Sequence, residues 1–278
     1  MYKLIASDMD ETFLDERHQI PEPNLRGLKR LRELGVLFVP SSGRGYPSIM
    51  DNFADVDPAL LEGGYVVSYN GGTINRFGDP EPLTEHALDH AIADAMWRLG
   101  VAHGICMHAY TPDGMVYVRD CPPSEATYLK GLRGIKPYEK DDLRGLPTIS
   151  KMLFMSDDFA WIQGEWAEVV RSALEGAADV TFSAGRYLEV VPKGVNKGTG
   201  LVELAGLLGI SVADTIGMGD SANDREMIEA AGCGVGVANV SADTRPSCDV
   251  ILKTTGMAGA LPEVIERIVL PSMKGVKH

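Results

Sequence analysis

The sequence of 278 residues lacks long apolar runs, and no secretory leader is expected. No stretch approaches the about 18 uninterrupted apolar residues of a membrane-spanning helix, so no such helix and no membrane partner are expected. Acidic residues occur by position 8, which leaves no room for the apolar region of a signal peptide. With 45% hydrophobic and 23% charged residues, the composition is that of a globular protein and excludes a disordered or fibrous chain.

Cysteine is scarce as well. The four cysteines are Cys106, Cys121, Cys233 and Cys248, and no two of them form a C-x-x-C pair. Together with the missing signal region, this scatter predicts reduced thiols in the core of a cytoplasmic protein.

Basic residues are outnumbered and not clustered. The chain has 39 acidic and 26 basic residues, which gives a formal net charge of −13. Nucleic acid is therefore not an expected partner, because neutralising its phosphates requires clustered Lys and Arg. An acidic surface also disfavours anionic substrates at long range.

Strands and helices alternate near both ends of the chain. At the start, the pattern predicts strands over Lys3–Ser7, Val36–Val39 and Tyr65–Ser68, with a helix from Pro23 to a stop at Gly35. After residue 191 it predicts, in order, helix Gly198–Leu208, strand Thr215–Met218, helix Ala222–Ala231, strands Gly234–Val237 and Asp249–Leu252, and helix Ala258–Val269. Such alternation is typical of a parallel sheet wrapped by helices.

The middle of the chain, residues 84–191, follows a different pattern. Short strands pair as hairpins, Gly104–Ala109 with Met115–Val118 and Val180–Ser183 with Tyr187–Val191, and a helix is expected over Phe159–Leu174. This is α+β in style, so we expect a second domain inserted into the first. A length of 278 residues agrees with about two domains.

The strongest chemical signal is Asp8-Met9-Asp10-Glu11-Thr12, directly after the first strand. Two carboxylates at a strand end can converge on one hard cation, and Mg²⁺ suits such oxygen ligands. A carboxylate can also attack phosphorus to form an aspartyl-phosphate. The alternative reading is a solvated acidic turn.

Further polar residues follow other strands. Asp220, in the run Gly217–Asp224, should lie near Asp8 because ligands bind at the carboxyl ends of parallel strands. Ser42 and the backbone N–H of Gly43 could hold a phosphate, and Lys197 could balance its negative charge. These residues also have purely structural explanations. Ser221, Asn223 or Asp224 would cap the following helix, Ser42 would form a turn, and Lys197 would be an exposed surface lysine.

Taken together, these motifs resemble those of the haloacid dehalogenase superfamily of phosphohydrolases, in its Cof-type branch. The matching pieces are D-x-D-x-T at 8–12, hydroxyl-Gly-Arg at 42–44, N-G-G at 70–72, K-G at 197–198 and G-D-S-x-N-D at 219–224. The resemblance implies an α/β, Rossmann-like core of residues 1–83 and 192–278. It also implies an α+β cap over residues 84–191 that sets substrate specificity.

The resemblance also implies a role for each residue. Asp8 would be the nucleophile and Asp10 the general acid and base. Asp8, Asp10 (through its backbone carbonyl) and Asp220 would bind Mg²⁺, the expected cofactor. The remaining residues would hold the phosphoryl group (Ser42, Gly43, Lys197, Asn223), orient Lys197 or a metal-bound water (Asp224), or line the entrance (Asn70, Gly71).

Two positions depart from the family pattern: Glu11 stands where most relatives have Gly, and Ser42 replaces the commoner Thr. The expected activity is Mg²⁺-dependent hydrolysis of small phosphate monoesters, such as sugar phosphates or phosphorylated cofactors, by a monomer or small homo-oligomer. A phosphosugar mutase and a non-catalytic phosphometabolite-binding protein are the alternatives.

Histidines and other polar residues of the middle region give weaker signals. His86 and His90 are four residues apart on an expected helix, a spacing that would allow a metal site, but no acidic ligand accompanies them and a structural role is favoured. Tyr110, Arg119, Arg186 and Tyr187 are candidates for selecting the substrate.

Overall fold

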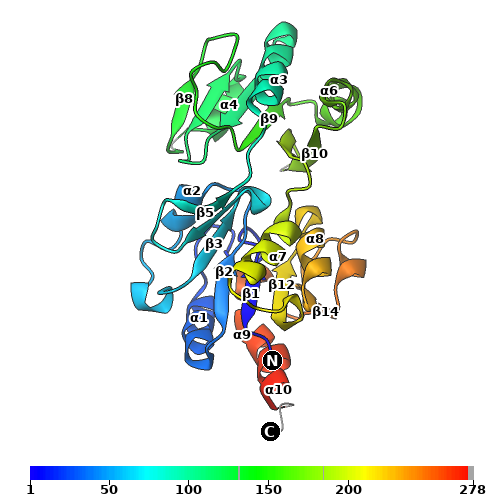
Figure 1. Cartoon of the computed structure of the whole chain (residues 1–278). Helices are drawn as coiled ribbons and strands as arrows, with labels where there is room; N and C mark the ends of the chain where they lie inside the picture. Colours follow the sequence, from blue (N-terminus) through cyan, green and yellow to red (C-terminus); the bar gives the residue numbers. More distant parts are fainter. Residues whose placement is uncertain (131, 184, 275–278) are drawn as a thin grey trace. The chain divides into compact units, whose positions relative to one another are not determined.

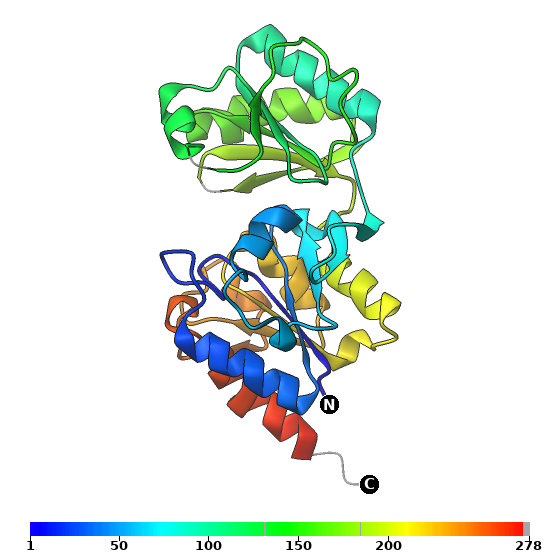
Figure 2. The ribbon, with the colours of Figure 1, turned by 90° about the vertical axis from the view of Figure 1, so that its left-hand side faces the viewer.

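A computed structural model describes residues 1–130, 132–183 and 185–274 (Figures 1 and 2). The chain divides into two compact units. The first contains Met1–Thr84 and Asn196–His278, and the second contains Glu85–Val195. The boundaries expected from the sequence, 83/84 and 191/192, lie one and four residues from these positions.

The first unit is built on a five-stranded parallel sheet. Its order is β14-β13-β12-β1-β2, and every described pair is parallel. The strands are β1 (Leu4–Ser7), β2 (Leu37–Pro40), β12 (Thr215–Gly219), β13 (Cys233–Gly236) and β14 (Val250–Ile251). The sequence predicted all five within one residue at each end. Their carboxyl ends therefore meet at one edge of the sheet.

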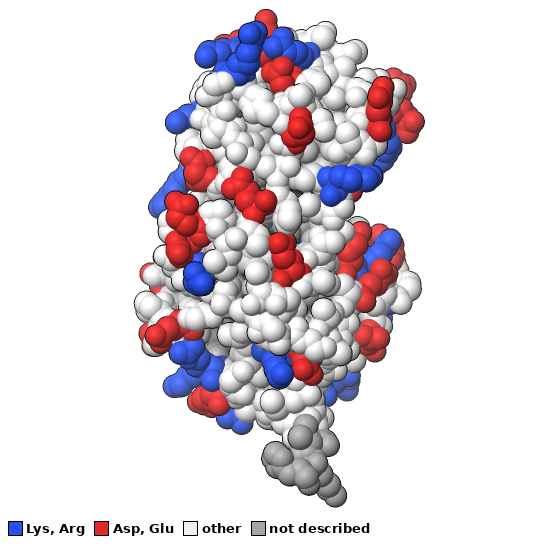
Figure 3. Space-filling view, in the orientation of Figure 1, with Lys and Arg blue, Asp and Glu red and all other residues white. Residues whose placement is uncertain are grey.

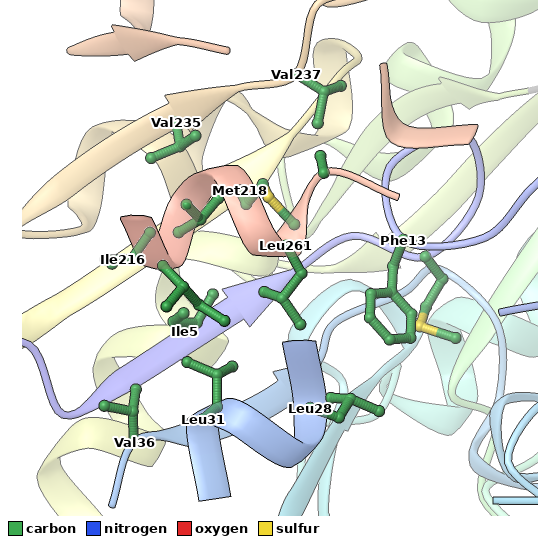
Figure 4. Close-up of a cluster of buried hydrophobic side chains, with 14 of the residues drawn as sticks. Ile5, Phe13, Leu28, Leu31, Val36, Ile216, Met218, Val235, Val237 and Leu261 are labelled. Atoms are coloured by element: carbon green, nitrogen blue, oxygen red, sulfur yellow. The ribbon is translucent and has the colours of Figure 1, made fainter. Parts of the chain in front are cut away.

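Helices cover both faces of this sheet. On one face, Leu28 and Leu31 of α1 (Glu22–Leu34) and Leu261 of α9 (Leu261–Val264) pack against Ile5 and Met218 (Figure 4). Since side chains alternate along a strand, Leu4 and Ala6 face the other way. There they pack with residues of α7 (Lys197–Leu207) and α8 (Arg225–Ala230), namely Leu201, Leu204 and Met227. The result is a three-layer α/β/α core.

The helix expected over Ala258–Val269 has more than one part. A short 3-10 turn (Gly256–Ala258) precedes α9, and a π-helical segment (Ile265–Val269) and α10 (Leu270–Lys274) continue it. The helix expected over Ala222–Ala231 likewise begins as a 3-10 turn (Ala222–Asp224) before α8.

Strand β3 (Tyr65–Ser68) was expected to join the parallel sheet, but it does not. It starts a separate three-stranded sheet with β4 (Thr73–Arg76) and β5 (Pro82–Glu85), and it pairs antiparallel with β4. The chain reverses here because Tyr69, Asn70 and Gly71 all have positive φ, at 50°, 54° and 99°. A single parallel bridge between Ser41 and Val67 keeps the end of β3 beside the end of β2.

The second unit has a six-stranded sheet in the order β10-β11-β9-β6-β7-β8, antiparallel except between β7 and β8. Its strands are β6 (Cys106–Tyr110), β7 (Val116–Arg119), β8 (Ile135–Pro137), β9 (Lys151–Met155), β10 (Ala178–Ser183) and β11 (Tyr187–Pro192). Both hairpins predicted from the sequence are present.

The helices of this unit pack largely on one face of the sheet. Trp97 of α3 (His90–His103) and Trp166 lie in one apolar cluster with Met107 and Phe154 of the sheet. Trp166 belongs to a continuous helical stretch, made of α5 (Phe159–Trp161), a π-helical segment (Ile162–Trp166) and α6 (Ala167–Leu174). The expected helix over 159–174 is thus confirmed. The region 120–147 contains the short helix α4 (Pro123–Tyr128) and β8.

The described part of the chain contains no helix both long and apolar enough to cross a membrane. On the face shown in Figure 3, Lys and Arg side chains are interspersed with Asp and Glu. The absence of nucleic-acid partners stays a prediction.

Candidate active site

Polar loops of the first unit meet at the carboxyl ends of its strands. Asp8 follows β1, Ser42 follows β2 and Asp220 follows β12. Parallel pairing sets Ser7 beside Pro40 and Met218, and the backbone N–H of Asp8 donates to the Met218 carbonyl at 2.9 Å. The register of three strands therefore brings these residues together from distant parts of the sequence.

Lys197 occupies the centre of this group. Its side chain is 0% exposed, which overturns the alternative reading of a surface lysine. The ammonium donates to Asp8 Oδ1 and, at 2.6 Å, to Asp224 Oδ1. Lys197 is the first residue of α7, whose N-terminus is capped by the Asn196 side chain accepting from Thr199 N at 2.9 Å. The cap fixes where the helix starts and hence where the lysine side chain begins.

Asp224 connects Lys197 to the loop after β12. Its Oδ2 accepts from the backbone N–H groups of Asp220 and Ser221, at 3.0 Å each. Residue 219 must be glycine here, since a Cβ at this position would lie 2.3 Å from Asp224 Cβ. Thr12 Oγ1 donates to Asp220 Oδ1 at 2.6 Å and so joins the loop after β1 to the loop after β12.

This group has an excess of negative charge. Oxygen atoms of Asp8, Asp220 and Asp224 all lie within 4.8 Å of one another, while Lys197 supplies the cation paired with two of them. Burial and the Asp224 carboxylate raise the pKa of Asp8 well above its usual range, against the opposing effect of Lys197. Burial raises the pKa of Asp220 to about 6. Burial alone would lower the pKa of Lys197, but the carboxylates of Asp224 and Asp8 raise it.

These residues fit a divalent cation. Three buried carboxylates and one ammonium leave a formal charge of −2, which one divalent ion would neutralise. Carboxylate oxygens are ligands that hard cations prefer. Asp224 already accepts four hydrogen bonds, so Asp8 and Asp220 are the better placed side-chain ligands.

Asp10 does not join the buried carboxylates. Its side chain is 40% exposed, with Oδ1 at 2.9 Å from His18 Nδ1 and Oδ2 at 3.3 Å from Arg44 Nε. Arg44 belongs to the hydroxyl-Gly-Arg motif, but spacing along the chain assigns no role to it or to His18. Only their proximity in the fold reveals that both contact Asp10.

The expected phosphate-binding residues lie on two of the loops. Ser42 is buried and its Oγ accepts from Arg44 N at 3.2 Å, as in the expected turn. Gly43 lies against the Asn70 side chain, where a Cβ would be 3.2 Å from Asn70 Oδ1. Asn223 is exposed and its Oδ1 accepts from Ser221 Oγ at 2.8 Å. Among the described residues, Asn223 makes this hydrogen bond to Ser221 and none to Lys197 or Asp8.

Glu11 adopts a conformation that glycine favours. Its φ is 60°, in the left-handed region, where a residue with a Cβ is strained by about 1–2 kcal/mol. The Glu11 carbonyl accepts from Asn239 Nδ2 at 3.0 Å and packs against Gly256, so the loop is held in this shape. Glu11 in place of the usual glycine therefore strains the backbone of this loop, but the loop keeps its conformation.

The helical spacing considered for His86 and His90 is not present, because His86 precedes α3 and only His90 lies in it. Arg119 and Arg186 pair with Asp141 and Glu125 within the second unit.

The architecture and the acidic site can be compared with known proteins. A family model described as haloacid dehalogenase-like hydrolase matches residues 5–264 of the chain. The chain belongs to this family. The resemblance inferred from the motifs is thereby confirmed, as is the fold class, an α/β core with a parallel sheet and a second, mostly antiparallel sheet region.

Proteins of similar length resemble the chain in sequence, in fold or in both. The Bacillus subtilis (strain 168) protein named "Putative phosphatase YxeH" is 28% identical over 274 residues, covering 95% of this chain and 99% of its own. A haloacid dehalogenase-like hydrolase from Bacteroides thetaiotaomicron is 27% identical, with a TM-score of 0.82, and covers 96% of this chain and 100% of its own. A Streptococcus mutans structure (SMU.1108c), 18% identical, shares the fold with a TM-score of 0.83 over 97% of this chain and 100% of its own.

Replacing Glu11 with Gly should stabilise the protein. Relief of the left-handed strain outweighs the greater freedom of glycine in the unfolded chain, so the free energy of unfolding should rise by about 0.5–1 kcal/mol. Thermal unfolding of the metal-free protein measures this. Glu11→Ala is the matched control, because it removes the carboxylate but keeps the Cβ. Equal stabilisation by both variants would show that the charge, and not φ, is responsible.

Replacing Asp220 with Asn should also stabilise the metal-free protein. An acid whose folded pKa is raised from 3.8 to about 6 favours folding below pH 3.8 and loses that contribution as the pH rises through 6. Above pH 6, Asp220→Asn should therefore be more stable by about 1–3 kcal/mol, a difference that shrinks toward pH 4. Urea unfolding with a chelator present tests this. Asp243→Asn, at an exposed carboxyl whose pKa is lowered, should give no gain.

Proposed function

We propose that this family member is a Mg²⁺-dependent phosphatase that hydrolyses small-molecule phosphate monoesters through an aspartyl-phosphate on Asp8. The observation that carries the proposal is the buried Asp8 carboxylate, held by Lys197 beside Asp220 at the carboxyl edge of the parallel sheet. The phosphatase name of the Bacillus subtilis relative supports the same chemistry.

In the first step, an Asp8 carboxylate oxygen attacks phosphorus and the bond to the ester oxygen breaks. The leaving alkoxide takes a proton from Asp10. Negative charge grows on the phosphoryl oxygens, where the Lys197 ammonium can stabilise it without reorganising, because Asp224 fixes its position. Ser42 and the Gly43 N–H would bind the same oxygens.

In the second step, Asp10 accepts a proton from the water that attacks the aspartyl-phosphate. Phosphate leaves, and Asp8 and Asp10 return to their starting states. One carboxyl can serve both steps, since the proton that it gives up in the first is recovered in the second. For this role the Asp10 side chain has to leave its contacts with His18 and Arg44 and turn toward the substrate.

Asp8, Asp220 and the backbone carbonyl of Asp10 would hold Mg²⁺. The ion would offset the carboxylate charge that raises the pKa of Asp8 and would polarise the phosphoryl group. Asp8 could then remain ionised, as a nucleophile must.

The second unit, Glu85–Val195, is proposed to act as the cap that selects the leaving group. The substrate class is small phosphorylated metabolites, sugar phosphates or phosphorylated cofactors. The expected cytoplasmic location and the monomeric or small homo-oligomeric state remain predictions.

Asp8→Asn should abolish phosphatase activity. The amide has no nucleophilic carboxylate, so hydrolysis of p-nitrophenyl phosphate with Mg²⁺ should fall by at least about 1,000-fold. Asp55→Asn, at an exposed aspartate of the same unit, is the control and should keep full activity. Retained turnover by Asp8→Asn would refute the mechanism. A requirement for a sugar bisphosphate in the unaltered enzyme would instead indicate a mutase.

Asp10→Asn should discriminate between leaving groups. A general acid contributes about 100- to 10,000-fold when the leaving oxygen is basic and little when it leaves readily. In single-turnover measurements, formation of the aspartyl-phosphate should therefore slow far more with an alkyl phosphate than with p-nitrophenyl phosphate. Equal slowing with both substrates would exclude Asp10 as the acid of the first step.

A further inference from the structure

Two cysteines and a histidine of the second unit converge in the fold. Cys106 Sγ lies 3.4 Å from Cys121 Sγ and 3.8 Å from His108 Nε2. The Cys121 Sγ is 3.9 Å from the same nitrogen. Cys106 and His108 are buried, and Cys121 is half-buried. Spacing along the chain does not reveal this group, because its cysteines are 15 residues apart.

The β6–β7 hairpin produces this convergence. Cys106 and His108 are two residues apart on β6, so their side chains point to the same face of the sheet. Antiparallel pairing places Met107 opposite Arg119, and Cys121 follows two residues later. The group lies on the face turned away from α3, where Cys106 packs with Leu153 and Tyr187.

We infer that Cys106, His108 and Cys121 form a zinc-binding site. Thiolates and imidazole are the donors that zinc prefers. The three interatomic distances define a triangle whose centre is about 2.1 Å from every corner. Zinc bonds to sulfur at about 2.3 Å and to histidine nitrogen at about 2.0–2.1 Å. An ion slightly above this centre would thus meet all three donors without a change in the backbone.

The neighbours of His108 suit a metal ligand. Its Nδ1 lies 3.5 Å from the Tyr110 hydroxyl. If the ring proton is on Nδ1 and points at that hydroxyl, Nε2 keeps a lone pair for the metal. A hydrogen-bond acceptor at the other ring nitrogen commonly orients a ligating histidine.

A fourth donor is close by. Glu125 of α4 is fully buried, and its Oε1 lies 3.4 Å from His108 Nε2. Tyr187 OH donates to this oxygen at 2.8 Å, and Arg186 Nη2 is 2.6 Å from the other one. With two thiolates, Glu125 and Arg186, a bound Zn²⁺ brings the formal charge of the cluster to zero. A buried cluster needs that balance.

A disulfide between the cysteines explains less of this arrangement. The sulfurs would have to approach from 3.4 Å to about 2.05 Å, and His108 and Glu125 would have no part in the bond. Cys121 also lines a cavity of about 370 Å³, along with Val118 and Ala126. A zinc ion here would hold β6 to the segment that leads into α4. The inference concerns a different unit from the proposed phosphatase site and does not rest on it.

Metal substitution tests the inference on the full chain. The protein is stripped with a chelator, reduced, and loaded with Co²⁺ while excess Mg²⁺ is present to occupy carboxylate sites. We expect a thiolate-to-Co²⁺ charge-transfer band and the intense visible absorption of a tetrahedral site, both removed by one equivalent of Zn²⁺. Competition with a chromogenic chelator then gives the zinc affinity. No thiolate band in the reduced, unaltered protein would overturn the inference.

Variants assign the site to its residues. Cys121→Ser should weaken zinc binding by at least about 100-fold, since even loss of an outer partner costs about 10- to 100-fold. Cys248→Ser, at a half-buried cysteine of the other unit, should leave it unchanged. Cys121→His keeps a ligand and should restore binding with a weaker charge-transfer band, which separates loss of a ligand from misfolding. Equal affinity in Cys121→Ser and Cys248→Ser would refute the assignment.

Discussion

The buried ammonium of Lys197 sets the main constraint on the first unit. An isolated charge in the protein interior is very unfavourable, so the fold is stable only if Asp8 and Asp224 approach this lysine. These partners are 189 and 27 residues away in the sequence. The strand order β12-β1-β2 and the start of α7 meet that requirement together. The same contacts that neutralise Lys197 therefore assemble the site.

The carboxylates outnumber the ammonium, and this imbalance links stability to function. Without a cation, burial and mutual repulsion raise the pKa of Asp8 and Asp220, which means that the folded state resists their ionisation. In an ion-pair network that served stability alone, the numbers of positive and negative charges would be expected to be equal. The loop after β1 carries a second cost, the left-handed Glu11, and is held by hydrogen bonds from Thr12 and Asn239. Strain and unbalanced charge concentrated in one loop are typical of a functional site.

Local pattern predicted the sheet strands well because they are short and mostly apolar runs with clear ends, as β2 is bounded by Gly35 and Pro40 and β1 ends before Asp8. The motif residues at their ends could be placed for the same reason: Asp8 and Asp220 follow adjacent parallel strands. The antiparallel pairing of β3 with β4 was not predicted, because it depends on backbone angles at Tyr69 and Asn70 that composition does not reveal. The contacts of Asp10 and the meeting of Cys106 with Cys121 depend on packing and strand register, which spacing along the chain does not report.

The two clusters differ in ligand chemistry, and under our proposals the difference keeps their metals apart. The oxygen donors of Asp8 and Asp220 suit Mg²⁺, but zinc generally binds a given site more tightly than magnesium does. Sulfur and nitrogen donors at Cys106, Cys121 and His108 have little affinity for Mg²⁺ and a strong one for zinc. A chain with both sets can draw scarce zinc to the soft site while abundant magnesium occupies the hard one. The selectivity between zinc and magnesium then follows from the donor atoms that the side chains at each sheet provide.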